Sequence, residues 1–420
     1  SNKLKPPFMF DVGLTTFMIL ATSMVMLMTP GLAFFYGGLG SRKHILSIMM
    51  QSFVSMGLTT LLWFFFGYSL CFSGNATDGT DFFGIIGNLD KAFFQGISPK
   101  TVFSAERNFP EFVFIAYQMM FAIITPALIT GAFINRISFK SYIWFLIFWQ
   151  IFVYYPFVHM VWGGGLLAMW GVLDFAGGIV VHATAGFAAL ASVYFVGARK
   201  EKKHMPNNIP LVAVGTALLW FGWYGFNAGS ELAVNDITVA AFLNTDMAAS
   251  FGAITWLIIE WNTGKKKPTF IGLMTGAVAG LATITPAAGY VTIQSAAIIG
   301  IIAGIGCYLA VKFKDLKGWD DALDVWGVHG MGGVIGTICL GLFATTTINP
   351  NGVDGLFYGG GAGLLLKEIA AILFAVVYAF FFTVFILKVI NRFIPVKASL
   401  REEKEGLDIS YHGEVARDIA

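Results

Sequence analysis

Long apolar stretches separated by short polar segments dominate this chain. A transmembrane helix needs about 20 consecutive, mainly apolar residues, and stretches of this kind bounded by charges or turn residues predict eleven spans. They cover residues 10–38, 44–72, 111–134, 141–160, 176–198, 209–229, 238–262, 269–287, 291–311, 324–345 and 360–392. The two stretches on either side of Gly289 have an alternative interpretation, a single kinked helix. The pattern therefore predicts an all-α polytopic membrane protein.

Basic residues gather in every second connecting segment. The members of this set are Arg42 and Lys43, Arg136 and Lys140, residues 199–203, residues 265–267 and residues 312–317. By the positive-inside rule, these connections lie in the cytoplasm. Eleven spans then predict an N-terminus outside the cell and a C-terminus in the cytoplasm.

Composition agrees with a membrane protein and excludes other classes. Of the 420 residues, 57% are hydrophobic and 12% are charged, the mean hydropathy is +0.74, and 49 glycines favour close contacts between helices. A net charge of +2 without a basic block excludes nucleic acid as a partner. The three cysteines lie in apolar stretches and lack the paired spacing of a zinc or redox site. We therefore expect a lipid bilayer around the chain and buried thiols within it.

Two predicted spans each contain an aspartate followed by a histidine. Asp174 begins the fifth span at its outer end, and His182 follows after eight residues; Asp324 begins the tenth span at its inner end, and His329 follows after five. An ionisable side chain inside a membrane costs about 2.5 kcal/mol or more, so it usually faces a partner or a water-filled path. The alternative is that each histidine only bonds a neighbouring helix.

The placement of these pairs predicts an internal repeat. The fifth span of each five-span half contains such a pair, and the two pairs enter the membrane from opposite faces. An inverted repeat about an axis in the membrane plane produces this arrangement. The repeats then cover about residues 10–198 and 209–345, followed by the long helix 360–392.

Aromatic and small polar residues surround the outer end of the fifth span. Phe121, Trp162, Phe226 and Ser230 fall in this region. An aromatic face attracts a desolvated cation by about 0.5–2 kcal/mol, and a serine hydroxyl can accept a hydrogen bond from it, so the set predicts a binding site for a small cation. Aromatic residues make up 16% of the chain, and the alternative is an interfacial belt or ordinary packing. Asp174 either makes this entrance electronegative or caps its helix, and the two roles are compatible.

Four motifs resemble the ammonium transporter family, the Amt/Mep proteins with their Rh relatives, and in particular the Amt branch. They are DFAGGIVVHATAG at 174–186, YQMMFAIITPAL at 117–128, GFNAGS at 225–230 and DVWGVHGMGG at 324–333. The motifs occur in the family's order, and the likeness runs from about Thr29 to the C-terminal tail.

The resemblance implies an ammonium transporter rather than an enzyme, with no cofactor and no metal site. Phe121, Trp162 and Ser230 resemble the outer ammonium-binding site of the family, and Asp174 resembles the aspartate near the pore entrance. Phe121 and Phe226 resemble the stacked gate above a hydrophobic pore.

The resemblance also implies the pore lining, the assembly and the location. His182 and His329 resemble the twin histidines of the pore, and the family forms homotrimers in the plasma (inner) membrane of the cell. Residues 1–392 then form the transmembrane domain. Residues 393–420 resemble the cytoplasmic regulatory segment on which PII-type signalling proteins act. An ordinary solvated chain end is the alternative for this tail.

A chemical difference between ammonium and potassium suggests how such a pore selects. The two cations are similar in size, but only ammonium, with methylammonium as its analogue, can give up a proton. We therefore expect deprotonation at the outer site, passage of NH3 and relay of the proton by the histidine pair. The likeness to the Amt branch favours electrogenic transport over an NH3 channel. Two other functions are an ammonium sensor with little transport and an intramembrane metalloenzyme, although the chain lacks a His-Glu-x-x-His motif.

Overall fold

Helices form nearly all regular structure in a computed structural model of the chain, which describes residues 10–202, 205–264 and 266–416. Ten helical segments within these ranges are long and apolar enough to cross a membrane. The same ranges contain only isolated β-bridges and no strand, so the prediction of an all-α polytopic membrane protein is confirmed. Four parts of the sequence predictions lie outside the described residues: Lys203 and His204, Lys265, residues 1–9 and residues 417–420.

The first half of the chain contains the following elements: α1 (Val12–Leu39), α2 (Ile45–Leu62), η2 (Trp63–Gly67), α3 (Tyr68–Phe72), α4 (Glu111–Ile129), α5 (Phe139–Trp149), η4 (Gln150–Tyr154), α6 (Tyr155–Trp162), α7 (Leu166–Trp170), η5 (Gly178–Ala183) and α8 (Thr184–Val196). The second half contains α9 (Ile209–Ala228), α10 (Asp236–Asn262), α11 (Phe270–Ile284), α12 (Ile293–Lys317), η7 (Trp326–Gly330), α13 (Met331–Phe343) and α14 (Gly363–Phe393). The tail adds α15 (Leu400–Glu405) and η9 (Asp408–His412). The elements η2, η4, η5, η7 and η9 are π-helical turns.

The stretches on either side of Gly289 form two separate helices, so the alternative of one kinked helix is wrong. α11 ends at Ile284, and α12 begins only at Ile293. α11 has 15 residues, which is short for a span, and it packs closely on α10. A Cβ at Gly280 would lie 2.1 Å from the carbonyl oxygen of Ala248, so glycine permits this contact.

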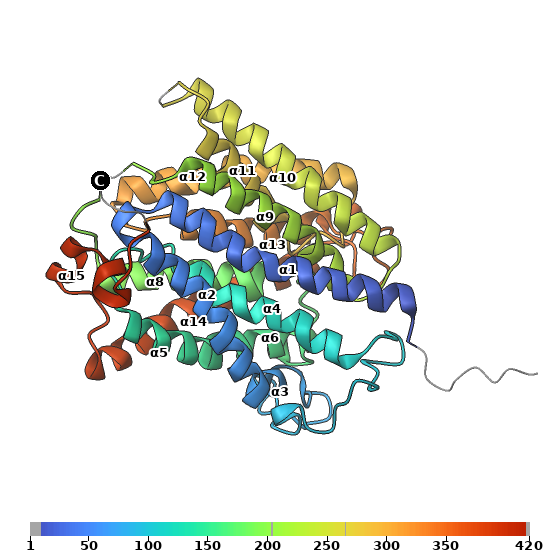
Figure 1. The fold of residues 1–420 in the computed structure, drawn as a ribbon. Coiled ribbons are helices and arrows are strands. Elements are labelled where there is room, and N and C mark those ends of the chain that lie inside the picture. Colours follow the sequence, from blue (N-terminus) through green and yellow to red (C-terminus); the bar gives the residue numbers. More distant parts are fainter. Residues whose placement is uncertain (1–9, 203–204, 265, 417–420) are drawn as a thin grey trace, which may run out of the picture.

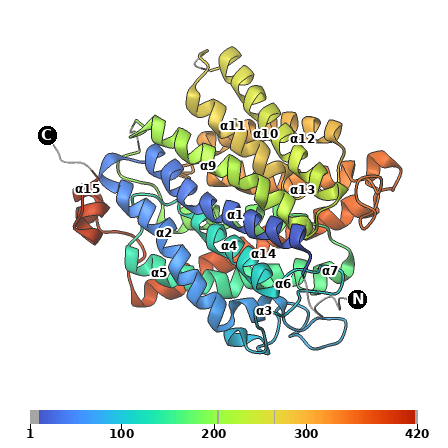
Figure 2. The ribbon, with the colours of Figure 1, turned by 45° about the vertical axis from the view of Figure 1, so that its right-hand side comes forward.

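The bundle has two ends, which we call the tail end and the far end. The tail end contains α15 and the connection between α1 and α2, and the far end contains the segment 73–110, which follows α3 (Figure 1). α10, α11 and α12 lie together on one side of the bundle, and α1 runs along α9 (Figure 2). This arrangement places η5, η7 and α4 in the interior.

The tail is fixed to the tail end by hydrogen bonds to two connections. The Asp408 carboxylate accepts hydrogen bonds from the backbone N–H groups of Leu46 (3.0 Å) and Ser47 (2.8 Å) at the start of α2. The N–H of Lys200, after α8, donates to Glu403 Oε1 (2.8 Å). The described part of the tail therefore packs on the bundle rather than extending from it.

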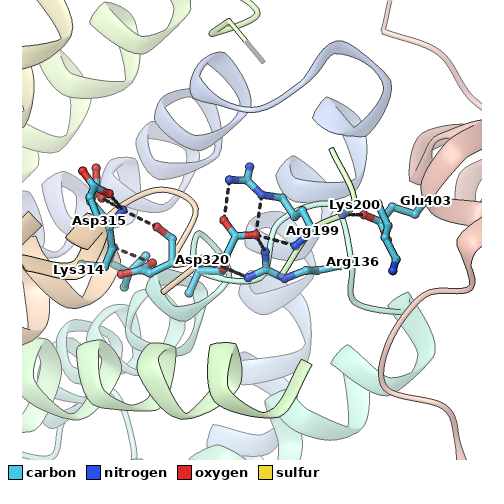
Figure 3. Close-up of polar contacts among 11 residues, drawn as sticks. Arg136, Arg199, Lys200, Lys314, Asp315, Asp320 and Glu403 are labelled. Atoms are coloured by element: carbon cyan, nitrogen blue, oxygen red, sulfur yellow. Dashed lines mark hydrogen bonds and ion pairs between the residues drawn. The ribbon is translucent and has the colours of Figure 1, made fainter. Parts of the chain in front are cut away.

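A buried ion cluster next to this contact joins three connections of the tail end (Figure 3). The Asp320 carboxylate accepts hydrogen bonds from Arg136 Nη1 (2.6 Å) and Arg199 Nη2 (2.8 Å), and the Arg136 side chain is fully buried. Burial opposes ionisation of Asp320, but the hydrogen bonds from Arg199 and the charge of Arg136 hold the pKa of this carboxyl below its usual value. Because Lys200 follows Arg199 directly, the cluster and the tail contact lie on adjacent residues.

Candidate functional site

The two histidines singled out by the sequence meet in the interior of the bundle. The Nδ1 atoms of His182 and His329 are 3.0 Å apart, and their rings are 5.2 Å apart between centroids and inclined by 16°. Both residues are buried. Because a neutral imidazole offers one N–H and one lone pair, one ring donates and the other accepts, and the pair shares a single hydrogen across this contact.

Each histidine belongs to a π-helical turn, and Asp174 holds the first of these turns. Its Oδ1 accepts hydrogen bonds from the N–H groups of Gly177 (2.9 Å) and Gly178 (2.7 Å), and its Oδ2 accepts from Ile179 (2.8 Å) and Val180 (3.1 Å). The first N–H groups of a helix lack partners within the helix, so one carboxylate satisfies four of them. The structure thus gives Asp174 the capping role, with its side chain buried beneath the turn.

Asp321, rather than Asp324, holds the second turn. Its two carboxylate oxygens accept hydrogen bonds from the N–H groups of Val325 (3.1 Å) and Trp326 (2.7 Å). The predicted start of this helix at Asp324 agrees with the structure to within one residue, since Val325 is the first helical residue, but Asp324 itself has a left-handed backbone at φ 59° and lies outside the helical region. The carboxylate of Asp324 instead pairs with Lys314 Nζ at 2.5 Å.

A signal for Asp321 was present in the sequence. Asp321 lies eight residues before His329, the same interval that separates Asp174 from His182. Asp324 is nearer to His329 in the sequence, so the prediction paired these two residues. The observed hydrogen bonds show that Asp321 is the carboxylate that holds the turn.

Two phenylalanines stack on the far-end side of the histidine pair. The rings of Phe121 and Phe226 lie 4.1 Å apart between centroids and are inclined by 14°, and Phe226 lies 6.2 Å from the ring of His182. Trp162 meets the ring of Phe121 edge to face at 6.0 Å, and its indole N–H donates to the backbone oxygen of Asp174 at 2.8 Å. The structure therefore brings together the predicted aromatic residues and the predicted aspartate.

Ser230 lies beside this aromatic group, next to a tyrosine that the sequence analysis did not single out. The Ser230 hydroxyl donates to the backbone oxygen of Phe226 (2.8 Å) and lies 3.2 Å from the hydroxyl of Tyr117. Tyr117 also contacts the ring of Phe121 at 5.1 Å. Because the Ser230 hydroxyl donates its hydrogen to the backbone oxygen of Phe226, its own oxygen keeps lone pairs that can accept a hydrogen bond from a ligand.

Trp223 is a second residue that sequence reasoning missed. Its indole ring stacks on His182 at 5.4 Å and 12°, and its N–H donates to Thr285 Oγ1 (2.9 Å). A tryptophan inside an apolar span usually indicates packing, so the sequence contains no separate signal for this contact.

Two cavities meet at His329. The first is narrow and mostly apolar, and runs beside Phe226 and His182 among Leu32, Ile124 and Leu219. The second, of about 240 Å³, lies towards the tail end and includes Asp324 and Arg199 in its lining. His329 borders both cavities, so the lining residues trace a path from the stacked phenylalanines past the histidine pair.

The ten apolar spans in the described part of the chain define a multi-pass membrane protein, and comparison with known proteins identifies its family. Residues 16–417 match the model of the Ammonium Transporter Family. The ammonium transporter of Bacillus subtilis (strain 168) is 44% identical over 409 residues, which cover 97% of this chain and 98% of that protein. The chain belongs to the ammonium transporter family.

Solved structures agree with this assignment. The crystal structure of Saccharomyces cerevisiae Mep2 matches with a TM-score of 0.85 and 34% identity, over 93% of this chain and 88% of that one. The structure of a sensor Amt protein matches with a TM-score of 0.85 and 29% identity, over 95% of this chain and 98% of that one.

Proposed function

We propose that this protein transports ammonium across the plasma membrane by binding NH4+ at the far end, removing its proton and conducting NH3 past His182 and His329. The observation that carries the proposal is the contact of 3.0 Å between the two Nδ1 atoms, in a path whose other walls are largely apolar. Such walls disfavour any cation that cannot lose its charge. Ammonium can do so, and potassium cannot.

Phe121, Trp162 and Ser230 form the proposed binding site for NH4+. The two aromatic rings, 6.0 Å apart, offer their π-electrons to the cation, and Ser230 accepts one of its hydrogen bonds. Phe121 also stacks on Phe226 at 4.1 Å. This stack is the proposed gate, and it must open for NH3 to reach the narrow cavity.

The histidine pair is the proposed proton relay. A proton delivered to one ring can leave from the other, since both rings contribute to one hydrogen bond. Transport is then electrogenic, because the proton crosses together with NH3. The alternative is passage of NH3 without the proton, as in a gas channel. NH3 carries no charge, so current measurements distinguish this alternative from electrogenic transport.

We further propose eleven membrane spans, with α11 as the span that is too short to be counted by length. The basic connections Arg42–Lys43 and Arg136–Lys140 lie at the tail end, which favours a cytoplasmic tail and an N-terminus outside. The equal interval between aspartate and histidine in the two halves supports an inverted repeat. The tail, residues 393–420, is the proposed regulatory segment and docking site for a PII-type protein.

A homotrimer is the proposed assembly. Asp246, in the middle of α10, is only half-buried and accepts hydrogen bonds from Trp220 (3.2 Å) and Tyr224 (2.5 Å). Exposed Phe242 and Leu243 lie on the same helix. A carboxylate facing lipid at mid-membrane is costly, which favours a second copy of the chain over this face.

Ammonium sensing with little transport is the second candidate function, favoured by the structural match to a sensor Amt protein. The test is the current produced by purified protein in proteoliposomes when ammonium, methylammonium or potassium is added. The proposal predicts a sustained current with ammonium, a smaller one with methylammonium and none with potassium. A binding transient without sustained current would contradict electrogenic transport, and uptake of labelled methylammonium would then separate the sensor, which takes up little, from an NH3 channel.

A further inference from the structure

His159 and Asp81 form a buried contact close to the proposed ammonium-binding site, since His159 lies three residues before Trp162 on α6. The Nε2 atom of His159 is 2.8 Å from Asp81 Oδ2, and the two side chains are only 0% and 3% exposed. His159 belongs to the last turn of α6, and Asp81 belongs to the segment 73–110, so the contact joins parts of the chain that are 78 residues apart. The sequence offered no companion for His159.

The second ring nitrogen of His159 has a partner of its own. Its Nδ1 lies 2.9 Å from the backbone oxygen of Cys71, near the end of α3. A carbonyl oxygen can only accept a hydrogen bond, so Nδ1 donates to Cys71, and Nε2 is left to bond the carboxyl group of Asp81. Both ring nitrogens of His159 are therefore held by residues of other elements.

Asp81 is held in place by a tight turn. Its Oδ1 accepts a hydrogen bond from the N–H of Gly84 (3.1 Å), while Gly84 in turn accepts one from the N–H of Leu166 (2.8 Å) at the start of α7. The N–H of Ala76 donates to the oxygen of Gly164 (3.0 Å). The segment 73–110 is thus bonded to the residues that directly follow Trp162.

The backbone of His159 ends the helix that contains Trp162. Its carbonyl oxygen accepts hydrogen bonds from the N–H groups of Gly163 and Gly165, both at 3.0 Å. There is no room between this turn and α3, because a Cβ at Gly163 would lie 2.0 Å from the oxygen of Cys71. Trp162 therefore directly precedes a turn that His159 and Asp81 hold in place.

We infer that His159 and Asp81 are positioning residues for Trp162. Through the turn at Gly163–Gly165, their contact fixes the indole ring against Phe121 and its N–H on the backbone of Asp174. The inference rests on the proposed role of Trp162 in binding ammonium. Loss of the contact lets the turn shift, which weakens ammonium binding more than it slows conduction through the pore.

The test measures ammonium-evoked currents in proteoliposomes for Asp81→Ala, Asp81→Asn, Asp81→Ser and Trp162→Leu. An asparagine can donate to Nε2 and accept from Gly84, so it preserves the contact without the carboxylate. A serine is too short to reach Nε2 but can still accept from the turn, which keeps the test valid if Asp81→Ala does not fold. Asp90→Ala removes an exposed carboxylate of the same segment and serves as the matched control.

Asp81→Ala and Asp81→Ser are expected to raise the KM for ammonium about three- to tenfold, as partial loss of an aromatic contact with the cation would. The maximal current should change by less than about twofold, because binding rather than conduction is affected. Asp81→Asn and Asp90→Ala should keep a KM close to that of the unaltered protein.

Two results would overturn the inference while leaving the proposed function intact. One is a raised KM in Trp162→Leu together with an unchanged KM in Asp81→Ala and Asp81→Ser. The other is an asparagine variant as impaired as alanine, which would assign the effect to the charge of Asp81 rather than to its contact. An unchanged KM in Trp162→Leu itself would refute ammonium binding at Trp162, and the inference would fall with it.

Discussion

Asp174 and Asp321 occupy equivalent places before the two histidine-bearing turns. Each lies eight residues ahead of its histidine, and each carboxylate accepts hydrogen bonds from backbone N–H groups at the start of a π-helical turn. A π-helical turn is rare and often marks a functional site. The two carboxylates thereby hold the backbone that brings His182 and His329 together.

Asp174→Ala should destabilise the protein strongly, because four buried N–H groups lose their acceptor. Each buried group without a partner costs about 1–3 kcal/mol, so we expect the free energy of unfolding to fall by at least about 3 kcal/mol. The measurement is the thermal unfolding midpoint of the purified protein in detergent. Asp11→Ala is the matched control, since Asp11 caps the exposed start of α1 through one N–H at 2.7 Å, worth about 1 kcal/mol. Equal losses in the two variants would contradict the role assigned to Asp174.

Ser230→Leu should weaken ammonium binding, because it removes the hydroxyl that is proposed to accept a hydrogen bond from the cation. A hydrogen bond to a charged group contributes about 1.5–3 kcal/mol, so the KM should rise at least about tenfold in a proteoliposome current assay. Ser23→Leu is the control, since Ser23 also donates to the carbonyl four residues back (2.9 Å) but is exposed. If the KM changes equally in both variants, Ser230 contributes only to helix packing and not to ammonium binding.

Asp320→Asn should lower stability in a pH-dependent way, since it leaves Arg136 and Arg199 without their counter-ion. Removing one partner of a buried ion pair costs about 3–5 kcal/mol. The folded-state pKa of Asp320 lies below the unfolded value of about 3.9. Its stabilising effect is therefore fully present above about pH 4 and is lost as the pH falls through the folded-state pKa. The unfolding midpoints of the two proteins should differ by a constant amount from pH 7 down to about pH 5, and the difference should shrink as the pH falls below about 4. A difference of unchanged size at pH 3 would refute the ionic role.

Asp408→Ala should release the tail from the start of α2 and change transport activity without changing selectivity. Long-range couplings of this kind typically amount to about 1–3 kcal/mol, so we expect the maximal ammonium current to change about fivefold or more. Deletion of residues 393–420 should reproduce this effect. The ratio of ammonium to potassium current should stay constant, and a changed ratio would place the tail in the pore itself.

Periodicity and charge predicted the all-α architecture, because a bilayer imposes a long apolar stretch on every spanning helix. The same pattern correctly separated α11 from α12, and it predicted a functional role for His182 and His329. It could not identify the carboxylate that caps the second turn, since Asp321 and Asp324 both lie just before it and differ in the side-chain partners that they find in the fold. Nor could it find the partners of His159 or the stack of Trp223 on His182. Those contacts join residues distant in sequence, and nothing in a local pattern specifies which distant residues will meet.

The histidine pair is proposed to conduct the proton and thereby to select ammonium over potassium. His182→Ala and His329→Ala each remove one half of the contact at 3.0 Å. The most direct measurement is the proteoliposome current of each variant with ammonium and with potassium, side by side with the unaltered protein. A positioned proton-transfer group contributes about a hundredfold or more to a rate, so each variant should lose nearly all of its selective ammonium current. Selective ammonium currents of unaltered size in both variants would contradict the account.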